Sequence, residues 1–130
     1  MAHVERSKQF DVSAAEMWGR IGGFQTPDSW HPAIVSCTAE EDGAVRRLTL
    51  GDGNVVVERL VGESEHSYTY RILDPGPLPV ADYEATITVR AGDGGGCIID
   101  WRANFTAAGA PDAEAETVIA GVFEGGLGAL

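Results

Sequence analysis

The segment CIIDWRANFT (97–106) decides the fold of this chain. Apolar side chains alternate in it with mostly polar ones, and the apolar set is Cys97, Ile99, Trp101, Ala103 and Phe105. Two earlier segments, SYTYRI (67–72) and YEATITVR (83–90), alternate in the same way. Because successive side chains of a strand point to opposite faces, the pattern predicts three strands that each carry one apolar, aromatic-rich face.

Turn signals extend the pattern of strands to most of the chain. Asp42-Gly43, Asp52-Gly53 and Asp93-Gly94 are dipeptides typical of hairpin turns. With the remaining breaks they predict strands over residues 3–12, 35–41, 44–50, 54–62, 66–73, 81–91 and 96–106. Because consecutive hairpins produce an antiparallel meander, we expect a single seven-stranded antiparallel sheet.

Three helical segments are expected beside the sheet. A capping box at Ser13–Glu16 starts a short helix that ends at Gly22-Gly23. Thr26-Pro27 suits the start of a second short helix. A long helix follows Pro111, and side chains at three- and four-residue spacing give it an apolar stripe: Ala115, Val118, Ile119, Val122, Phe123, Leu127 and Leu130.

The long final helix is unusually rich in glycine, with Gly121, Gly125, Gly126 and Gly128 in its second half. Such a helix presents little side-chain volume to the wide aromatic face that it must cover. The predicted sheet and helices make an α+β domain. The mismatch between the helix and the wide sheet face predicts a cavity between them. A cavity of this kind predicts a small-molecule ligand.

Length and charge limit the classes of function. The 130 residues are expected to form a single domain, residues 1–130, and the net charge of −11 repels phosphate backbones, so we expect no nucleic-acid partner. No apolar stretch approaches the ~20 residues of a membrane span, so we expect no membrane insertion. The N-terminus lacks a signal-peptide layout, and we expect a cytoplasmic protein. The sequence leaves the oligomeric state open, and a homodimer is compatible with it.

Metal and phosphate signals are missing from the sequence. His3, His31 and His66 are scattered, and no spacing of His, Cys and Asp suits a metal. The glycine-rich runs 51–53 and 92–96 fall between predicted strands, whereas a phosphate-binding loop should open a helix. We therefore expect no metal and no cofactor.

Four segments carry a family resemblance that covers essentially the whole chain. DVSAAEMWGRIGGF (11–24), SWHPAIVSC (29–37), VVVERLVGESEHSYTYRI (55–72) and GPLPVADYEATITV (76–89) resemble the bacterial polyketide cyclase/dehydrase-like branch of the Bet v 1/START-like (SRPBCC) superfamily. The resemblance implies the helix-grip fold, in which a curved seven-stranded antiparallel sheet with two short helices holds a long C-terminal helix.

A more distant likeness is to the plant abscisic-acid receptors. It rests on Ser36-Cys37, Glu58-Arg59-Leu60 and Tyr83. The stretches that match the receptors' gate and latch loops, residues 49–53 and 78–80, do not carry the receptors' own loop sequences. The position of the receptors' ligand-pairing lysine holds His31 here. The likeness therefore implies a gated pocket and does not imply binding of abscisic acid.

Two functions follow from the resemblance. The first is binding of a small hydrophobic molecule, which is polyketide-, lipid- or terpenoid-like, between the sheet and the final helix. The second is an enzyme of the cyclase, dehydratase or aromatase type. In that alternative Glu58, with Tyr83 or His31, would move protons on an apolar substrate.

Glu58 is the main candidate for a functional side chain and the weak candidate for a catalytic one. Parity allows only one of Glu58 and Arg59 to point inward, and the sequence does not choose, because both faces of that strand are rich in apolar residues. The resemblance places Glu58 inside. There it would either exchange protons with a substrate, because burial raises a carboxyl pKa, or orient a ligand or water. A surface position is the remaining alternative.

The other candidate ligand-binding residues are mainly aromatic. Tyr68, Tyr70 and Tyr83 offer hydroxyl groups on an aromatic wall, and they serve either a ligand or the core. Trp101 is either core or pocket floor. The remaining candidates are His31 at the second short helix, Leu78 and Val80 in the latch-like stretch, and Phe123 on the final helix.

Among the basic residues, Arg46 is the best candidate for an inward-facing cation. It shares strand parity with Leu48 and Leu50, so an inward leucine face would carry Arg46 with it. Arg71 and Arg102 lie on the polar sides of their strands, where we expect solvent.

Overall fold

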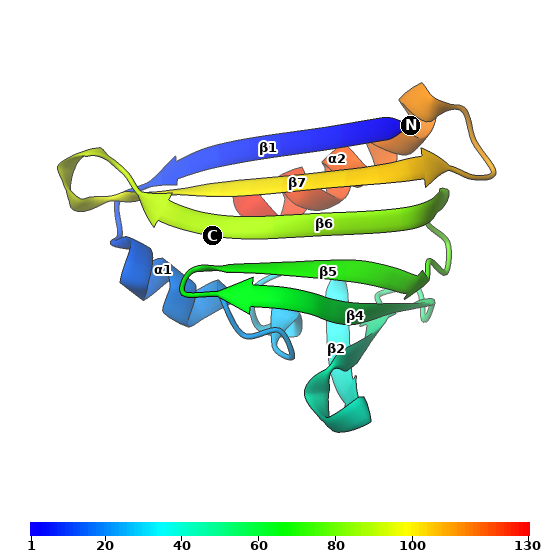
Figure 1. Cartoon of the computed structure of the whole chain (residues 1–130), viewed down its shortest axis with the longest axis horizontal. Helices are drawn as coiled ribbons and strands as arrows, with labels where there is room; N and C mark the ends of the chain where they lie inside the picture. The colour runs from blue at the N-terminus through cyan, green and yellow to red at the C-terminus, as the bar shows by residue number, and fades with distance from the viewer.

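The computed structural model describes residues 1–130 and contains seven strands. They are β1 (Ala2–Phe10), β2 (Ile34–Glu40), β3 (Val45–Leu50), β4 (Val55–Ser64), β5 (Ser67–Asp74), β6 (Val80–Ala91) and β7 (Cys97–Ala107). The helices are α1 (Ala14–Ile21) and α2 (Asp112–Gly128), with single 3-10 turns η1 (Pro27–Ser29), η2 (Glu41–Gly43) and η3 (Asp93–Gly95). The strands form one antiparallel sheet in the order β1-β7-β6-β5-β4-β3-β2 (Figure 1).

This architecture confirms the predicted helix-grip fold. Each predicted strand is present, with ends shifted by at most a few residues. Ser13 caps α1 as expected, since its hydroxyl oxygen accepts a hydrogen bond from the Glu16 amide at 3.1 Å. The second short helix is only the turn η1, because Pro32 lacks an amide donor and disfavours a helical conformation at the residue before it.

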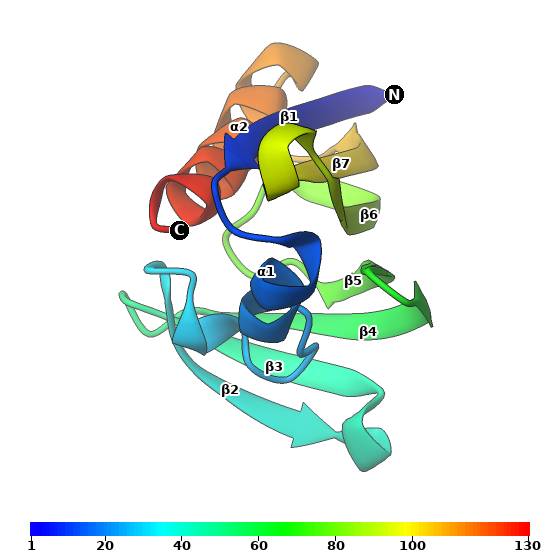
Figure 2. The ribbon, with the colours of Figure 1, turned by 90° about the vertical axis from the view of Figure 1, so that its left-hand side faces the viewer.

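The sheet curls strongly, so that its two halves face each other. Figure 2 shows α2 beside β1 and β7, while β2, β3 and β4 lie on the opposite side of the molecule. Register shifts in the β4–β5 pair and in the β6–β7 pair mark bulges, which increase local twist. No helix of the chain is long and apolar enough to span a bilayer.

The aromatic faces predicted from the alternating strands form the buried core. Ile87, Ile99 and Phe105 are completely inaccessible. Trp101 of β7 stacks on Phe123 of α2, with ring centroids 4.2 Å apart and an interplanar angle of 14°. This stack joins the middle of the sheet to the helix, and such aromatic pairs contribute about 0.5–1.5 kcal/mol beyond the area that they bury.

The sequence suggested that the glycines of α2 leave empty space for a ligand, but at Gly126 protein side chains occupy that space. A Cβ atom on Gly126 would lie 2.7 Å from His31 Cδ2 and 3.0 Å from Trp30 Cζ3. Gly121 and Gly128 have no neighbouring atoms within 4 Å on that side. The expectation is therefore wrong at Gly126, because the segment after η1 inserts its own side chains against the helix.

His31 fastens this segment to α2. Its Nε2 lies 2.8 Å from the Val122 carbonyl oxygen, and its Nδ1 lies 3.2 Å from the Ala33 amide nitrogen. A carbonyl can only accept and an amide can only donate, so these contacts fit the neutral tautomer with the proton on Nε2. Burial lowers the pKa of His31; the Val122 hydrogen bond opposes this shift, and the nearby Arg46 charge adds to it.

We predict opposite effects of alanine at two glycines of α2. Gly126→Ala should destabilise the protein by about 1–3 kcal/mol, because the added methyl group overpacks the Trp30–His31 contact. Gly121→Ala, the matched control in the same helix, should stabilise it by about 0.5–1 kcal/mol through helix propensity. Urea unfolding measures both values. Equal stabilisation by the two substitutions would show that His31 and Trp30 do not pack against Gly126.

We also predict a pH dependence that originates at His31. Because the folded pKa lies below the unfolded value of about 6.5, the neutral ring contributes stability that is complete above that pH. This contribution is lost as the pH falls from about 6.5 through the folded pKa. The stability difference between wild type and His31→Gln should therefore shrink between pH 7.5 and pH 5. Parallel stability curves for the two proteins over this range would contradict the assignment.

Candidate functional site

A cavity of about 120 Å³ lies between the curled sheet, the segment around η1 and one side of α2. Most of its walls are apolar. They come from Pro27, Trp30, Ala33, Ile34, Leu48, Leu50, Val56, Leu78, Trp101 and Val122. The polar lining residues are His31, Arg46, Glu58, Tyr68 and Tyr70. Apolar walls with a few convergent polar groups are typical of sites for small molecules.

A buried ion pair forms the polar wall of the cavity. Arg46 on β3 and Glu58 on β4 are direct cross-strand partners, and their exposed fractions are 4% and 6%. Arg46 Nε donates to Glu58 Oε1 at 2.8 Å, and Nη2 lies 2.7 Å from the same oxygen. The inward position that the resemblance implied for Glu58 and the inward face proposed for Arg46 are therefore both observed.

Further contacts hold the Arg46 guanidinium in place. Its Nη1 donates to the Phe24 carbonyl oxygen at 2.8 Å and to the Tyr68 hydroxyl at 3.4 Å. The guanidinium carbon lies 4.3 Å from the Phe24 ring centroid and 4.9 Å from that of Tyr70. Arginine over an aromatic ring gains cation–π energy, which is larger where water is excluded. The charge is thus fixed in one orientation beside the cavity.

Burial changes the acidity of the groups at this wall. Removal from water raises the pKa of the Glu58 carboxyl, and the attraction of Arg46 opposes that rise. Burial likewise raises the pKa of the Tyr70 hydroxyl, and the negative charge of Glu58 adds to this effect. Burial by itself would lower the pKa of the Arg46 guanidinium, but the Glu58 carboxylate together with Tyr68 and Tyr70 raises it above the ordinary value, so Arg46 stays protonated. The Tyr70 side chain therefore remains a neutral hydroxyl group.

Trp30 closes the cavity on the side of α2. Its ring centroid lies 5.7 Å from that of Trp101 and the same distance from that of His31. Its indole Nε1 is sealed from solvent and has no hydrogen-bond partner. A buried donor without an acceptor costs about 1–3 kcal/mol. Trp30 was not among the candidate residues from the sequence, because its place at the cavity depends on an irregular segment that strand and helix periodicity does not describe.

Most of the candidate residues from the sequence meet at the cavity. Its lining includes His31, Glu58, Tyr68, Tyr70, Trp101 and Leu78. Three other candidates lie elsewhere. Phe123 is buried beneath Trp101, whereas Val80 and Tyr83 line a separate depression.

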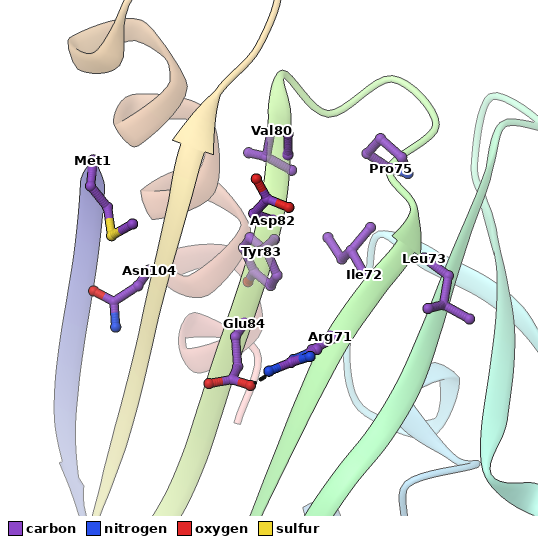
Figure 3. Close-up of a pocket in the computed structure, with 11 residues that line it drawn as sticks. Met1, Arg71, Ile72, Leu73, Pro75, Val80, Asp82, Tyr83, Glu84 and Asn104 are labelled. Carbon is purple, nitrogen blue, oxygen red and sulfur yellow. Dashed lines mark hydrogen bonds and ion pairs between the residues drawn. The ribbon is translucent and has the colours of Figure 1, made fainter.

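That depression, of about 630 Å³, opens on the outer side of the sheet where β5 and β6 separate (Figure 3). Pairing between the two strands ends at Arg71 and Glu84, whose side chains form an ion pair at 2.8 Å. Beyond this pair a bulge in β6 places Asp82 at φ 51°. The depression is open, its charged groups are exposed, and Arg71 and Glu84 already neutralise each other, so its chemistry is that of ordinary surface.

The gate-like and latch-like stretches meet beside the cavity. Leu50 at the end of β3 and Leu78 in the β5–β6 loop both line it. Gly76 adopts φ +54°, and a Cβ atom there would collide with the Val55 carbonyl oxygen. Only glycine allows this close approach, which brings the β5–β6 loop against the start of β4.

Comparisons with known proteins agree with this architecture. The family model described as polyketide cyclase/dehydrase and lipid transport matches residues 1–130. None of the curated proteins matches the chain. The solved structure of the protein XoxI from Bacillus cereus is 36% identical over 99% of this chain and 92% of its own, with a TM-score of 0.96.

Two more distant structures share the fold. A START superfamily protein from Mycobacterium smegmatis is 14% identical, with a TM-score of 0.81 over 99% of this chain and 94% of its own. The ZhuI aromatase/cyclase from Streptomyces sp. R1128 is 19% identical, with a TM-score of 0.76 over 98% of this chain and 87% of its own. On the full-length family match and the similarity to XoxI, the chain belongs to the polyketide cyclase/dehydrase and lipid transport family.

Proposed function

We propose that this protein binds a small hydrophobic molecule in the cavity beside Arg46 and Glu58. The observation that carries the proposal is a buried, oriented ion pair at the wall of an otherwise apolar cavity. Replacing a buried ion pair by apolar residues of similar volume is often neutral or stabilising. The pair therefore contributes little to stability beyond what apolar residues would provide. Its fixed charges are well suited to orient a polar group of a ligand.

The apolar walls would supply most of the affinity. Burial of about 100 Å² of ligand surface contributes about 2.5 kcal/mol before the costs of ordering. A polyketide-, lipid- or terpenoid-like molecule is longer than the cavity, so only one end of it would fit there. The rest of the ligand would extend out of the cavity past Leu50 and Leu78, which belong to the gate-like and latch-like stretches.

A second candidate function is acid–base catalysis by Glu58. It is favoured by the carboxyl's place at the cavity wall and by its raised pKa, which brings a carboxyl toward the range of useful proton transfer. The partners proposed from the sequence do not support it. Both ring nitrogens of His31 are engaged by backbone groups, and Tyr83 does not line the cavity. The neighbour that Glu58 does have is Arg46, which does not exchange protons near neutral pH. Binding is therefore the better-supported function.

Filling the cavity tests the proposal. Val122→Phe adds side-chain volume at the cavity wall and should lower the affinity for toluene, a neutral apolar probe, by about tenfold or more. Val118→Phe is the control, because Val118 is exposed on the same helix one turn earlier. Titration of toluene followed by NMR chemical shifts measures both affinities. Equal affinity of the two variants would mean that toluene does not occupy this cavity.

A further inference from the structure

We infer that the cavity prefers a neutral, ring-sized group that carries a hydroxyl, such as a phenol or a cyclic alcohol, over an apolar ring or a carboxylate. This inference rests on the proposed function and narrows it to a ligand chemistry. Three independent features of the cavity support it: its size, its charge balance and its free hydrogen-bonding groups.

The size of the cavity sets the size of the group. A void of about 150 Å³ with apolar walls is large enough for benzene. The volume here is about 120 Å³, so one small ring is the largest rigid group that fits without movement of the walls. Trp30 and Trp101 contribute aromatic surface to those walls, and such surface favours a flat apolar ring.

The charge balance argues against an anionic ligand. Arg46 is the only cationic side chain of the lining, and Glu58 already neutralises it. His31 is neutral because burial lowers its pKa, and its Nδ1 accepts a hydrogen bond from the Ala33 amide. A ligand carboxylate would therefore bring a second negative charge beside Glu58 with no free cation to receive it. Moving an ion from water into such a site is unfavourable because the ion loses its hydration, whereas a neutral hydroxyl avoids this cost.

The unused hydrogen-bonding groups match a hydroxyl. Both contacts between Arg46 and Glu58 end on Oε1 of the carboxylate. The other carboxylate oxygen, Oε2, accepts no hydrogen bond from the chain. The only side-chain polar atom that is both sealed and unpaired is Trp30 Nε1, so Glu58 Oε2 borders open space. A carboxylate oxygen in an apolar cavity favours a donor, and a ligand hydroxyl is a neutral one.

A tyrosine can donate a hydrogen bond to the oxygen of a ligand hydroxyl. The Tyr68 hydroxyl oxygen accepts from Arg46, and the Tyr70 hydroxyl oxygen accepts from Trp101 Nε1 at 3.2 Å. Tyr68 thereby keeps its own O–H as a donor at the cavity wall, whereas the Tyr70 hydroxyl is also hydrogen-bonded with Tyr83. A hydroxyl is the smallest neutral group that can both donate to Glu58 and accept from a tyrosine.

The test compares three ring compounds of similar size on the full chain at pH 7. Phenol, toluene and benzoate are titrated separately, and binding is followed by NMR chemical shifts. We expect phenol to bind about tenfold or more tightly than toluene, because hydrogen bonds to charged groups are the stronger class. Benzoate should bind at least tenfold more weakly than phenol.

Variants on β4 separate the role of Glu58 from general effects. Glu58→Gln removes the negative charge and should reduce the preference for phenol over toluene, taken as the ratio of the two affinities in the same variant, to less than about threefold. Glu63→Gln, at an exposed position of the same strand, should keep the full preference. If Glu58→Gln does not fold, as judged by its thermal transition, the comparison of the three compounds on the wild-type protein still decides whether the cavity prefers a neutral hydroxyl group.

Each outcome has one meaning. Toluene binding as tightly as phenol, or benzoate binding as tightly as phenol, would overturn the preference for a neutral hydroxyl and leave the proposed apolar ligand site standing. Absence of saturable binding by all three compounds would overturn both. A phenol preference that survives in Glu58→Gln would overturn the assignment to Glu58.

Discussion

The ion pair between Arg46 and Glu58 constrains the rest of this structure. Two opposite charges with almost no exposure must remain together, since an unpaired buried charge costs about 3–5 kcal/mol. Their contact fixes the register of β3 against β4, and the Arg46 bond to the Phe24 carbonyl ties the loop after α1 to the sheet. The aromatic rings of Phe24 and Tyr70 pack around the guanidinium. One side of the cavity is therefore rigid and polar, and its shape follows from this pair.

The opposite side of the cavity is built by an irregular segment. Trp30 and His31 fill the space beside Gly126, so the glycine-rich helix accommodates protein side chains where a ligand was expected. This arrangement explains both the small volume and the position of the cavity, which lies toward β3, β4 and β5 rather than beneath the glycines. It also explains why α2 depends on its neighbours, since a helix with so many glycines has weak intrinsic propensity.

The sequence predicted the strands well, because alternation and hairpin turns are local signals. It placed Arg46 inward by parity but could not choose between Glu58 and Arg59, whose strand is apolar on both faces; the resemblance made that choice. The alternation of inward and outward side chains also breaks down at the start of β6. Val80 and Tyr83 are an odd number of residues apart, yet both are buried, because the bulge at Asp82 adds a residue to the strand. The contacts of Trp30 and His31 with Gly126 depend on tertiary packing between distant segments, which no periodicity encodes.

We propose that the ion pair is retained for the ligand rather than for stability. The most direct test is a double-mutant cycle with Arg46→Met, Glu58→Leu and both together, in which unfolding free energy and phenol affinity are measured on the same samples. We predict that each single substitution destabilises the protein by about 3–5 kcal/mol, that the double variant regains wild-type stability or exceeds it, and that the double variant loses the phenol preference. A double variant as unstable as the single ones, or one that still prefers phenol, would contradict it.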